Sequence, residues 1–204
     1  MYSLQYDIRG KMREFGLGMD YGHVKLAPHN DKWADAFNEI NEYITYRLES
    51  QSIWRGQDFR VKHIGSTSLP IMAKPVLDFA VVCMDGDAMR AAGARWSIRS
   101  TLCGSIGFES SGHLHDLKNQ DLLAYLHLHS SPNWELTEQL LFKKFMLEHP
   151  ETAKEYEQLK IQSAVGKPNY KDYSDKKYDF VNKINQKAFK EYGEPTHDEV
   201  LELV

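Results

Sequence analysis

A glycine and a run of hydroxyl side chains interrupt an apolar stretch in the first half of the chain. Residues 59–64 are predicted to form a strand, and Gly65, Ser66 and Thr67 follow it directly. A strand that ends in glycine and opens a helical turn presents free backbone N–H groups and a positive dipole end, which together bind phosphate. Most isolated motifs of this kind are ordinary helix starts, so the prediction of a phosphate site depends on what lies beside the turn.

One carboxylate, Asp78, lies in a second apolar strand predicted within residues 76–84. Buried strands accept a carboxylate only where something pairs with it. A hairpin-like connection would place Asp78 beside Ser66. A carboxylate next to a phosphate-binding turn holds Mg²⁺ against a nucleoside triphosphate, because a hard cation takes oxygen ligands from both. The alternative partners of Asp78 are backbone donors or Lys74.

Two histidines, His127 and His129, stand two residues apart on the predicted return strand of a β-hairpin. Their spacing places them on one face of that strand. With Asp78 they would form a His/His/Asp metal set that favours Mn²⁺ or Zn²⁺ over Mg²⁺, or they would contact phosphate directly. Hydrogen-bonded structural roles are the open alternative. A second pair, His113 and His115, could face them across the hairpin, although exposed positions are favoured for it.

Lysines near these motifs predict a local cation set for a triphosphate, although the chain as a whole has a net charge of −4. The lysines that we assign to phosphate binding are Lys74, Lys143, Lys160 and Lys177, with Lys62 close in sequence to the turn. For Lys160, a solvated position on a helix is a slightly favoured alternative.

The composition indicates one globular domain. The chain has 204 residues, of which 42% are hydrophobic and 26% charged, and no basic excess points to nucleic acid or a membrane surface. Its two cysteines, Cys83 and Cys103, cannot staple a domain of this size and fit a reducing compartment. Residues 1–16 lack the apolar core of a signal peptide, and no apolar run approaches the ~20 residues of a membrane span. We therefore expect a cytoplasmic protein.

The elements that must position these residues predict an α+β fold, with a mixed β-sheet, flanking helices and a C-terminal helical subdomain. Residues 1–21 are predicted as a loosely packed extension and 22–131 as the α/β core. Residues 132–192 are the helical part of the same domain, and 193–204 are an acidic tail that is either disordered or an interaction segment.

Within these regions, the apolar periodicity predicts a short strand at 23–28, an amphipathic helix at about 30–48 and a further helix at about 85–100. Three helices follow residue 132. A loop is expected at 166–173, with Ser174 as the N-cap of the last helix.

Several motifs, in order, closely resemble the GrpB-like family. The stretch HIGSTSLPIMAKPVLDFAVV at 63–82 is similar to the family signature H-I-G-S-T-[AS]-[VL]-P followed by K-P and an apolar strand with aspartate. The resemblance continues in VKLAPHNDKWADAFNEI, YLHLH, WELTEQLLFKKFMLEHPETAKEYEQLK and YSDKKYDFV, and it covers about residues 22–190.

The family is classed in the nucleotidyltransferase, or polymerase-β-like, superfamily. The resemblance therefore implies that Gly65 and Ser66 bind nucleotide phosphate and that Asp78 binds a divalent metal, Mg²⁺ or Mn²⁺. The implied reaction transfers a nucleoside monophosphate from NTP to an acceptor, and pyrophosphate leaves. Active members of the superfamily usually carry two carboxylates one residue apart on this strand. Here the second position is Ala80, and the GrpB-like family generally has an apolar residue there too.

Three functions are thus open. The first is a metal-dependent nucleotidyltransferase that acts on an unknown small molecule or protein. The second is a non-catalytic nucleotide- or phosphate-binding module, which Ala80 favours. The third, less favoured, is a metallo-phosphoesterase built on Asp78, His127 and His129.

Overall fold

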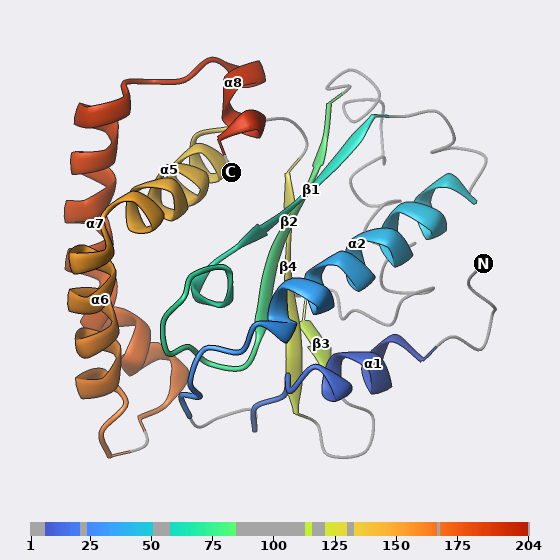
Figure 1. Cartoon of the computed structure of the whole chain (residues 1–204), viewed down its shortest axis with the longest axis horizontal. Coiled ribbons are helices and arrows are strands. Elements are labelled where there is room, and N and C mark those ends of the chain that lie inside the picture. Colours follow the sequence, from blue (N-terminus) through green and yellow to red (C-terminus); the bar gives the residue numbers. More distant parts are fainter. Residues whose placement is uncertain are drawn as a thin grey trace.

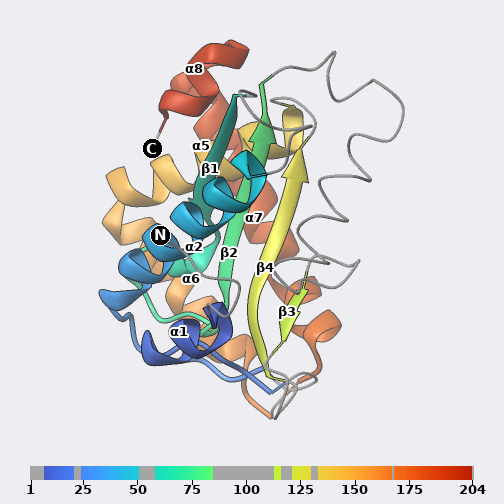
Figure 2. The ribbon, with the colours of Figure 1, turned by 90° about the vertical axis from the view of Figure 1, so that its right-hand side faces the viewer.

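A four-stranded mixed β-sheet forms the centre of the molecule, in the order β1-β2-β4-β3. The strands are β1 (Phe59–Ile64), β2 (Leu77–Cys83), β3 (His113–His115) and β4 (Leu122–His129). β1 and β3 run antiparallel to their neighbours, whereas β2 and β4 are parallel. Figure 2 shows β1, β2 and β4 side by side. This computed structural model describes residues 7–20, 24–50, 58–84, 113–115, 121–129, 133–166 and 168–203.

Helices cover the sheet from two sides, so the predicted α+β class with a mixed sheet is confirmed (Figure 1). The helices α1 (Ile8–Glu14) and α2 (Lys32–Glu49) lie on one side. The other side carries α5 (Trp134–Glu148), α6 (Pro150–Ser163), α7 (Tyr170–Tyr192) and α8 (His197–Glu202). A 3-10 turn, η1 (Ser66–Ser68), leaves the end of β1.

Alternation along β2 separates two apolar cores, because successive side chains of a strand point to opposite faces. Leu77, Phe79 and Val81 belong to the larger cluster, which includes buried residues of α1 and α2. Ala80 and Val82 belong to a second cluster with residues of α5 and α8. Asp78 therefore shares its face with the second cluster.

A third cluster fixes the connection between η1 and β2. Leu69 and Ile71 in this connection pack against buried side chains of α5, α6 and α7, including Leu141 and Tyr156. The turn that was predicted to bind phosphate is thereby joined to the helical part of the chain.

The N-terminal region differs from the prediction of a loosely packed arm. Residues 7–20 contain α1, and its Ile8 and Met12 are buried in the larger core. The strand predicted at 23–28 is also wrong over its described residues, where a single bridge between Ala27 and Ala73 replaces it. A single pair of backbone hydrogen bonds joins the two alanines.

Two further corrections concern the C-terminal region. The last long helix begins at Tyr170 rather than after Ser174, because Asn169 caps it by accepting from the backbone N–H of Asp172 at 2.9 Å. Part of the acidic tail forms α8 instead of a disordered segment. A Thr196–Glu199 capping box starts this helix.

The predicted hairpin is confirmed as the antiparallel pair β3–β4, whose register places His113 opposite Tyr125 and His115 opposite Leu122. The two histidine pairs therefore do not face each other. The helix predicted at about 85–100 lies outside the described residues. Among the helices that the structure does describe, none has the length and apolar character needed to cross a membrane.

Candidate functional site

Gly65 and Asp78 meet at the end of the β1–β2 pair. The antiparallel register places Ile64 opposite Asp78, so the first residue after β1 lies against the aspartate side chain. A Cβ atom added to Gly65 would lie 2.6 Å from Asp78 Oδ2 and 2.7 Å from Asp78 Cβ. The backbone of Gly65 has φ +69°, which also disfavours a side chain. The predicted neighbourhood of the turn and the carboxylate is confirmed.

His63 joins the turn to α2 through a hydrogen bond and a ring contact, a role that the sequence reasoning missed. Its Nε2 lies 3.0 Å from Thr67 Oγ1, and its ring stacks on Phe37 at a centroid distance of 5.0 Å. Burial, together with the charge of Lys143 and against that of Asp78, lowers the pKa of His63 to about 3. His63 is therefore neutral at physiological pH and acts as a structural hydrogen-bonding group.

The hydroxyl groups of the turn are partly committed to its own structure. Thr67 is buried and its hydroxyl pairs with His63. Ser68 donates through its hydroxyl to the carbonyl of Gly65 at 2.7 Å. Ser66 opens the 3-10 turn directly after Gly65. Of the turn residues predicted to bind phosphate, Thr67 therefore has its hydroxyl engaged with His63.

The His127 side chain lies near that of Asp78, whereas the His129 side chain contacts Asn133. The His127 Nε2 atom lies 3.8 Å from Asp78 Oδ1, and both side chains remain partly exposed. His129 is buried, and its Nδ1 atom lies 3.0 Å from the side-chain amide of Asn133. Among the described residues, no group of three His, Cys, Asp or Glu side chains is placed to hold a metal. The His/His/Asp set, and with it the metallo-phosphoesterase, therefore finds no assembled site in this part of the chain.

Lys74, Lys160 and Lys177 lie near one another, and the charge of Asp78 acts on Lys74 and Lys177. The ammonium group of Lys177 lies 4.1 Å from the ring centroid of Tyr173, and that of Lys74 lies 5.8 Å from the same ring. Lys160 lies 5.0 Å from the ring centroid of Tyr156. Aromatic faces thus support all three cations.

The pKa values of these lysines reflect crowding of buried positive charge. Burial, together with the charge of Lys74 and against that of Asp78, lowers the pKa of Lys177 to about 7. Burial, together with the charge of Lys177, lowers the pKa of Lys160 to about 7. The pKa of Lys74 is lowered by burial against the attraction of Asp78. An anion bound among these groups would relieve their repulsion.

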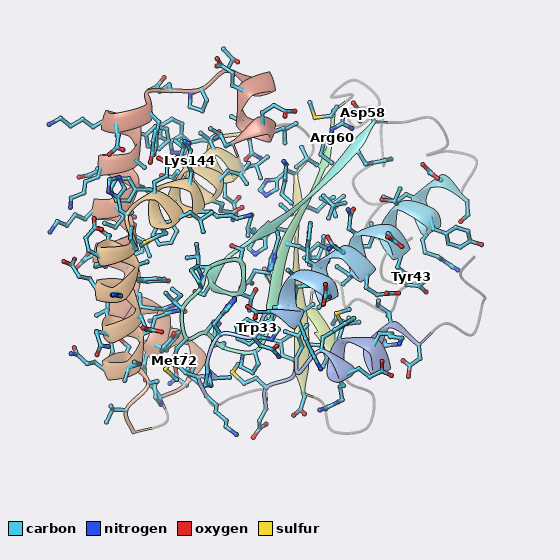
Figure 3. All side chains as sticks on the ribbon, in the orientation of Figure 1. Trp33, Tyr43, Asp58, Arg60, Met72 and Lys144 are labelled. Carbon is cyan, nitrogen blue, oxygen red and sulfur yellow. The ribbon has the colours of Figure 1, made fainter. Side chains whose placement is uncertain are left out.

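Lys160 has a second task in this cluster. It is 1% exposed, and its ammonium group donates to the backbone carbonyl of Met72. The backbone N–H of the same Met72 donates to Glu157 Oε1 at 2.5 Å. Helix α6 therefore holds both polar backbone groups of one residue in the η1–β2 connection, and Met72 lies beside this helix in Figure 3. Lys160 is a loop anchor whose charge contributes to the site.

Lys143 contacts the end of β1, directly before the turn. Its ammonium group donates to the carbonyl of His63 at 3.1 Å. Burial and the charge of Lys62 lower its pKa. The single cation set expected from the sequence is thus divided into two groups by the charges that act on them, Lys74 with Lys160 and Lys177, and Lys62 with Lys143.

Ala80, at the position of the missing second carboxylate, is fully buried. It lies in the apolar cluster with Ile64, Val82, Leu136 and Leu140. A carboxylate at this position would be surrounded by hydrocarbon. The apolar packing around position 80 is therefore a physical reason for the absence of a second acidic residue there.

Comparisons with other proteins agree with this architecture. Residues 23–187 match the family described as GrpB protein. UPF0157 protein YqkA of Bacillus subtilis is 28% identical over 154 residues, which are 72% of this chain and 41% of that relative, so the chain spans less than half of YqkA. Glutamate-rich protein GrpB of Alkalihalophilus pseudofirmus is 26% identical over 178 residues, or 82% of this chain and 97% of the relative.

A solved structure shares the fold. The crystal structure of conserved protein GrpB from Enterococcus faecalis superposes with a TM-score of 0.66 at 25% sequence identity, over 83% of this chain and 100% of the solved one. Both α1 and α8 lie outside residues 23–187, the region that matches the family.

Proposed function

Because the chain belongs to the GrpB family, we propose that it binds a nucleoside triphosphate at the Gly65 turn and transfers the nucleoside monophosphate to an acceptor. The observation that carries this proposal is a carboxylate that adjoins a glycine turn and acts on two half-buried lysines. Asp78 touches Gly65, and its charge acts on both Lys74 and Lys177. A polyphosphate with a divalent cation supplies the charges that this arrangement attracts.

Asp78 and His127 would hold the metal. Their 3.8 Å separation is one that a single ion can bridge. An oxygen and an imidazole nitrogen together favour Mn²⁺ over Mg²⁺, and phosphate oxygens of the nucleotide would complete the ligand set. When bound, the metal would neutralise charge on the phosphates.

The protein residues position the reacting groups. Lys74 and Lys177 would bind the outer phosphates and favour departure of pyrophosphate, while the Gly65 backbone admits the phosphate chain. The acceptor oxygen forms a bond to the α-phosphorus as the bond from this phosphorus to the β-bridging oxygen breaks. Pyrophosphate leaves with the electron pair of the broken bond. The acceptor hydroxyl proton passes to water at the partly exposed edge beside Asp78 and His127.

Ala80 favours a second candidate function, which is nucleotide or phosphate binding without transfer. One carboxylate bridges two metal ions poorly, and the buried Ala80 offers no replacement ligand. In this case the lysines and the Gly65 turn would bind the nucleotide as a regulatory or accessory ligand.

Thermal unfolding with ATP and Mn²⁺ tests both candidates. Ligand at 100 times its Kd stabilises by about 2.7 kcal/mol, which raises Tm by roughly 5–10 °C for a chain of this length. Asp78→Asn should abolish this shift, whereas Asp179→Asn, at an exposed position on α7, should retain it. Release of pyrophosphate supports transfer. A shift that persists in EDTA without pyrophosphate release supports binding alone, and no shift with any nucleotide would overturn both.

A further inference from the structure

Two groups of lysines lie near the Gly65 turn, Lys74 with Lys160 and Lys177, and Lys62 with Lys143. Asp78 acts on members of the first group. The charges that act on Lys177 are those of Lys74 and Asp78, whereas the charge that acts on Lys143 is that of Lys62. The charges of both Lys143 and Asp78 act on His63.

We infer that Lys62 and Lys143 form a second anion site, which binds a phosphate group carried by the acceptor. This inference rests on the proposed function, in which Lys74 and Lys177 take the polyphosphate of the nucleotide. A substrate whose anionic group occupies the second site would lie along the same face of the sheet as Asp78. The acceptor class is therefore a phosphorylated small molecule.

The register of the sheet places the second site close to the first. Lys62 pairs with Ala80, and two residues further along Ile64 pairs with Asp78. Because alternate residues share a face, Lys62 and Asp78 point to the same side of the sheet. Helix α5 brings Lys143 to this side, where its ammonium group lies 3.1 Å from the carbonyl of His63. Lys143 thus contacts the end of β1 near the turn, and Lys62 belongs to the same strand.

The C-terminal helix supplies an internal anion to this pair. The charge of Glu202 on α8 acts on Lys62 and raises its pKa against the larger effect of burial. Val200 and Leu201 hold α8 in the apolar cluster that contains Ile64 and Ala80. Glu202 is itself exposed, so its carboxylate can be displaced by a dianionic group without breaking the packing of α8. It therefore competes with the acceptor phosphate.

Charge matching favours a phosphate group at this pair. Lysine ammonium groups are compact point charges without the planar fork of arginine, and two of them balance a dianion. A ligand with a single carboxylate would bring only the one negative charge that Glu202 already supplies to Lys62.

Isothermal titration of inorganic phosphate into protein saturated with ATP and Mg²⁺ tests the inference. The wild-type protein should bind phosphate while ATP stays bound. Lys62→Gln should weaken phosphate binding at least about tenfold, as expected for a lost charged hydrogen bond, and leave ATP affinity within about twofold. Lys177→Gln should have the reverse effect. Lys154→Gln, at an exposed position on α6, is the control and should change neither.

A gain of binding separates the site from a folding defect. Glu202→Gln should strengthen phosphate binding by about two- to fivefold, the range of an exposed charge interaction. Competition between phosphate and ATP, or equal losses in Lys62→Gln and Lys177→Gln, would show a single site and overturn the inference. If ATP does not bind at all, the proposed function fails. Phosphate binding to the free protein that depends on Lys62 would still support the second site.

Discussion

Along β2, residues 77, 79 and 81 face the core formed with α1 and α2, whereas residues 78, 80 and 82 face α5 and α8. The first set is entirely apolar and fully buried. The second set begins with Asp78, which adjoins Gly65 and His127. Residues adjacent in sequence therefore face opposite sides of the sheet and serve different purposes.

The difference shows how this domain separates stability from chemistry. Burial of apolar surface on the α2 side contributes favourable free energy. The other side contains buried lysines whose lowered pKa values record a cost of desolvation and mutual repulsion. The apolar face offsets this cost. Substitutions on one face should therefore change mainly stability, and substitutions on the other mainly binding.

The largest effect on stability is expected from Phe79→Ala, on the α2 side. Loss of this fully buried ring should lower the free energy of unfolding by about 3–5 kcal/mol. Its neighbour Asp78, changed to Asn, should alter stability by less than about 1 kcal/mol while it abolishes metal-dependent binding. Urea denaturation measures both changes. Equal destabilisation by the two variants would contradict the division between the faces.

A smaller loss is expected from Gly65→Ala, which forces a methyl group against Asp78. We expect a cost of about 3 kcal/mol from the clash and the left-handed backbone together. Gly166→Ala is the matched control, because Gly166 has φ +81° with no atom within 4 Å of an added Cβ. It should cost only about 1 kcal/mol. Similar losses in chemical denaturation would mean that backbone strain alone explains the glycine.

The smallest effect has the opposite sign. Lys177→Met replaces a buried, repelled cation and should raise Tm by roughly 2–6 °C at pH 7, while it weakens nucleotide binding. Lys176→Met changes an exposed lysine on the same helix and should leave both unchanged. A lower Tm in Lys177→Met would show that the ammonium group stabilises the folded chain.

Lys177→Met also tests how the free energy of unfolding depends on pH, which urea denaturation at several pH values measures. An unfolded lysine keeps its proton up to its ordinary pKa of 10.5, whereas folded Lys177 loses it above about 7. The unfolded chain therefore binds more protons between these values, and the free energy of unfolding contributed by this group rises with pH. In Lys177→Met this rise should be smaller but still present, since Lys160 behaves similarly.

The sequence was sufficient for the parts of the site that local order determines. A short connection between two apolar strands placed Gly65 beside Asp78, and alternation placed His127 on the correct face. The division of the lysines was not predictable, because Lys143 depends on how α5 packs across the sheet. His63 was missed although it precedes the turn by two residues. Its role requires Phe37, which comes from α2.

The errors at the chain ends have a related physical cause. α1 and α8 contain 7 and 6 residues, too few to be stable as isolated helices. Packing of Ile8 and Val200 into the two cores stabilises them instead. The early start of α7 had a local signal, because Asn169 stands three residues before the acidic Asp172.

The bond between Arg13 and Asp121, at 2.5 Å, joins residues 108 positions apart in the chain. Next to it, Met19 pairs through its backbone with Leu122. During synthesis, the N-terminal segment therefore leaves the ribosome long before the strand against which it docks. Its apolar residues can pack against β4 only after that strand has been synthesised. Completion of the α2-side core is therefore a late, long-range event that slows folding.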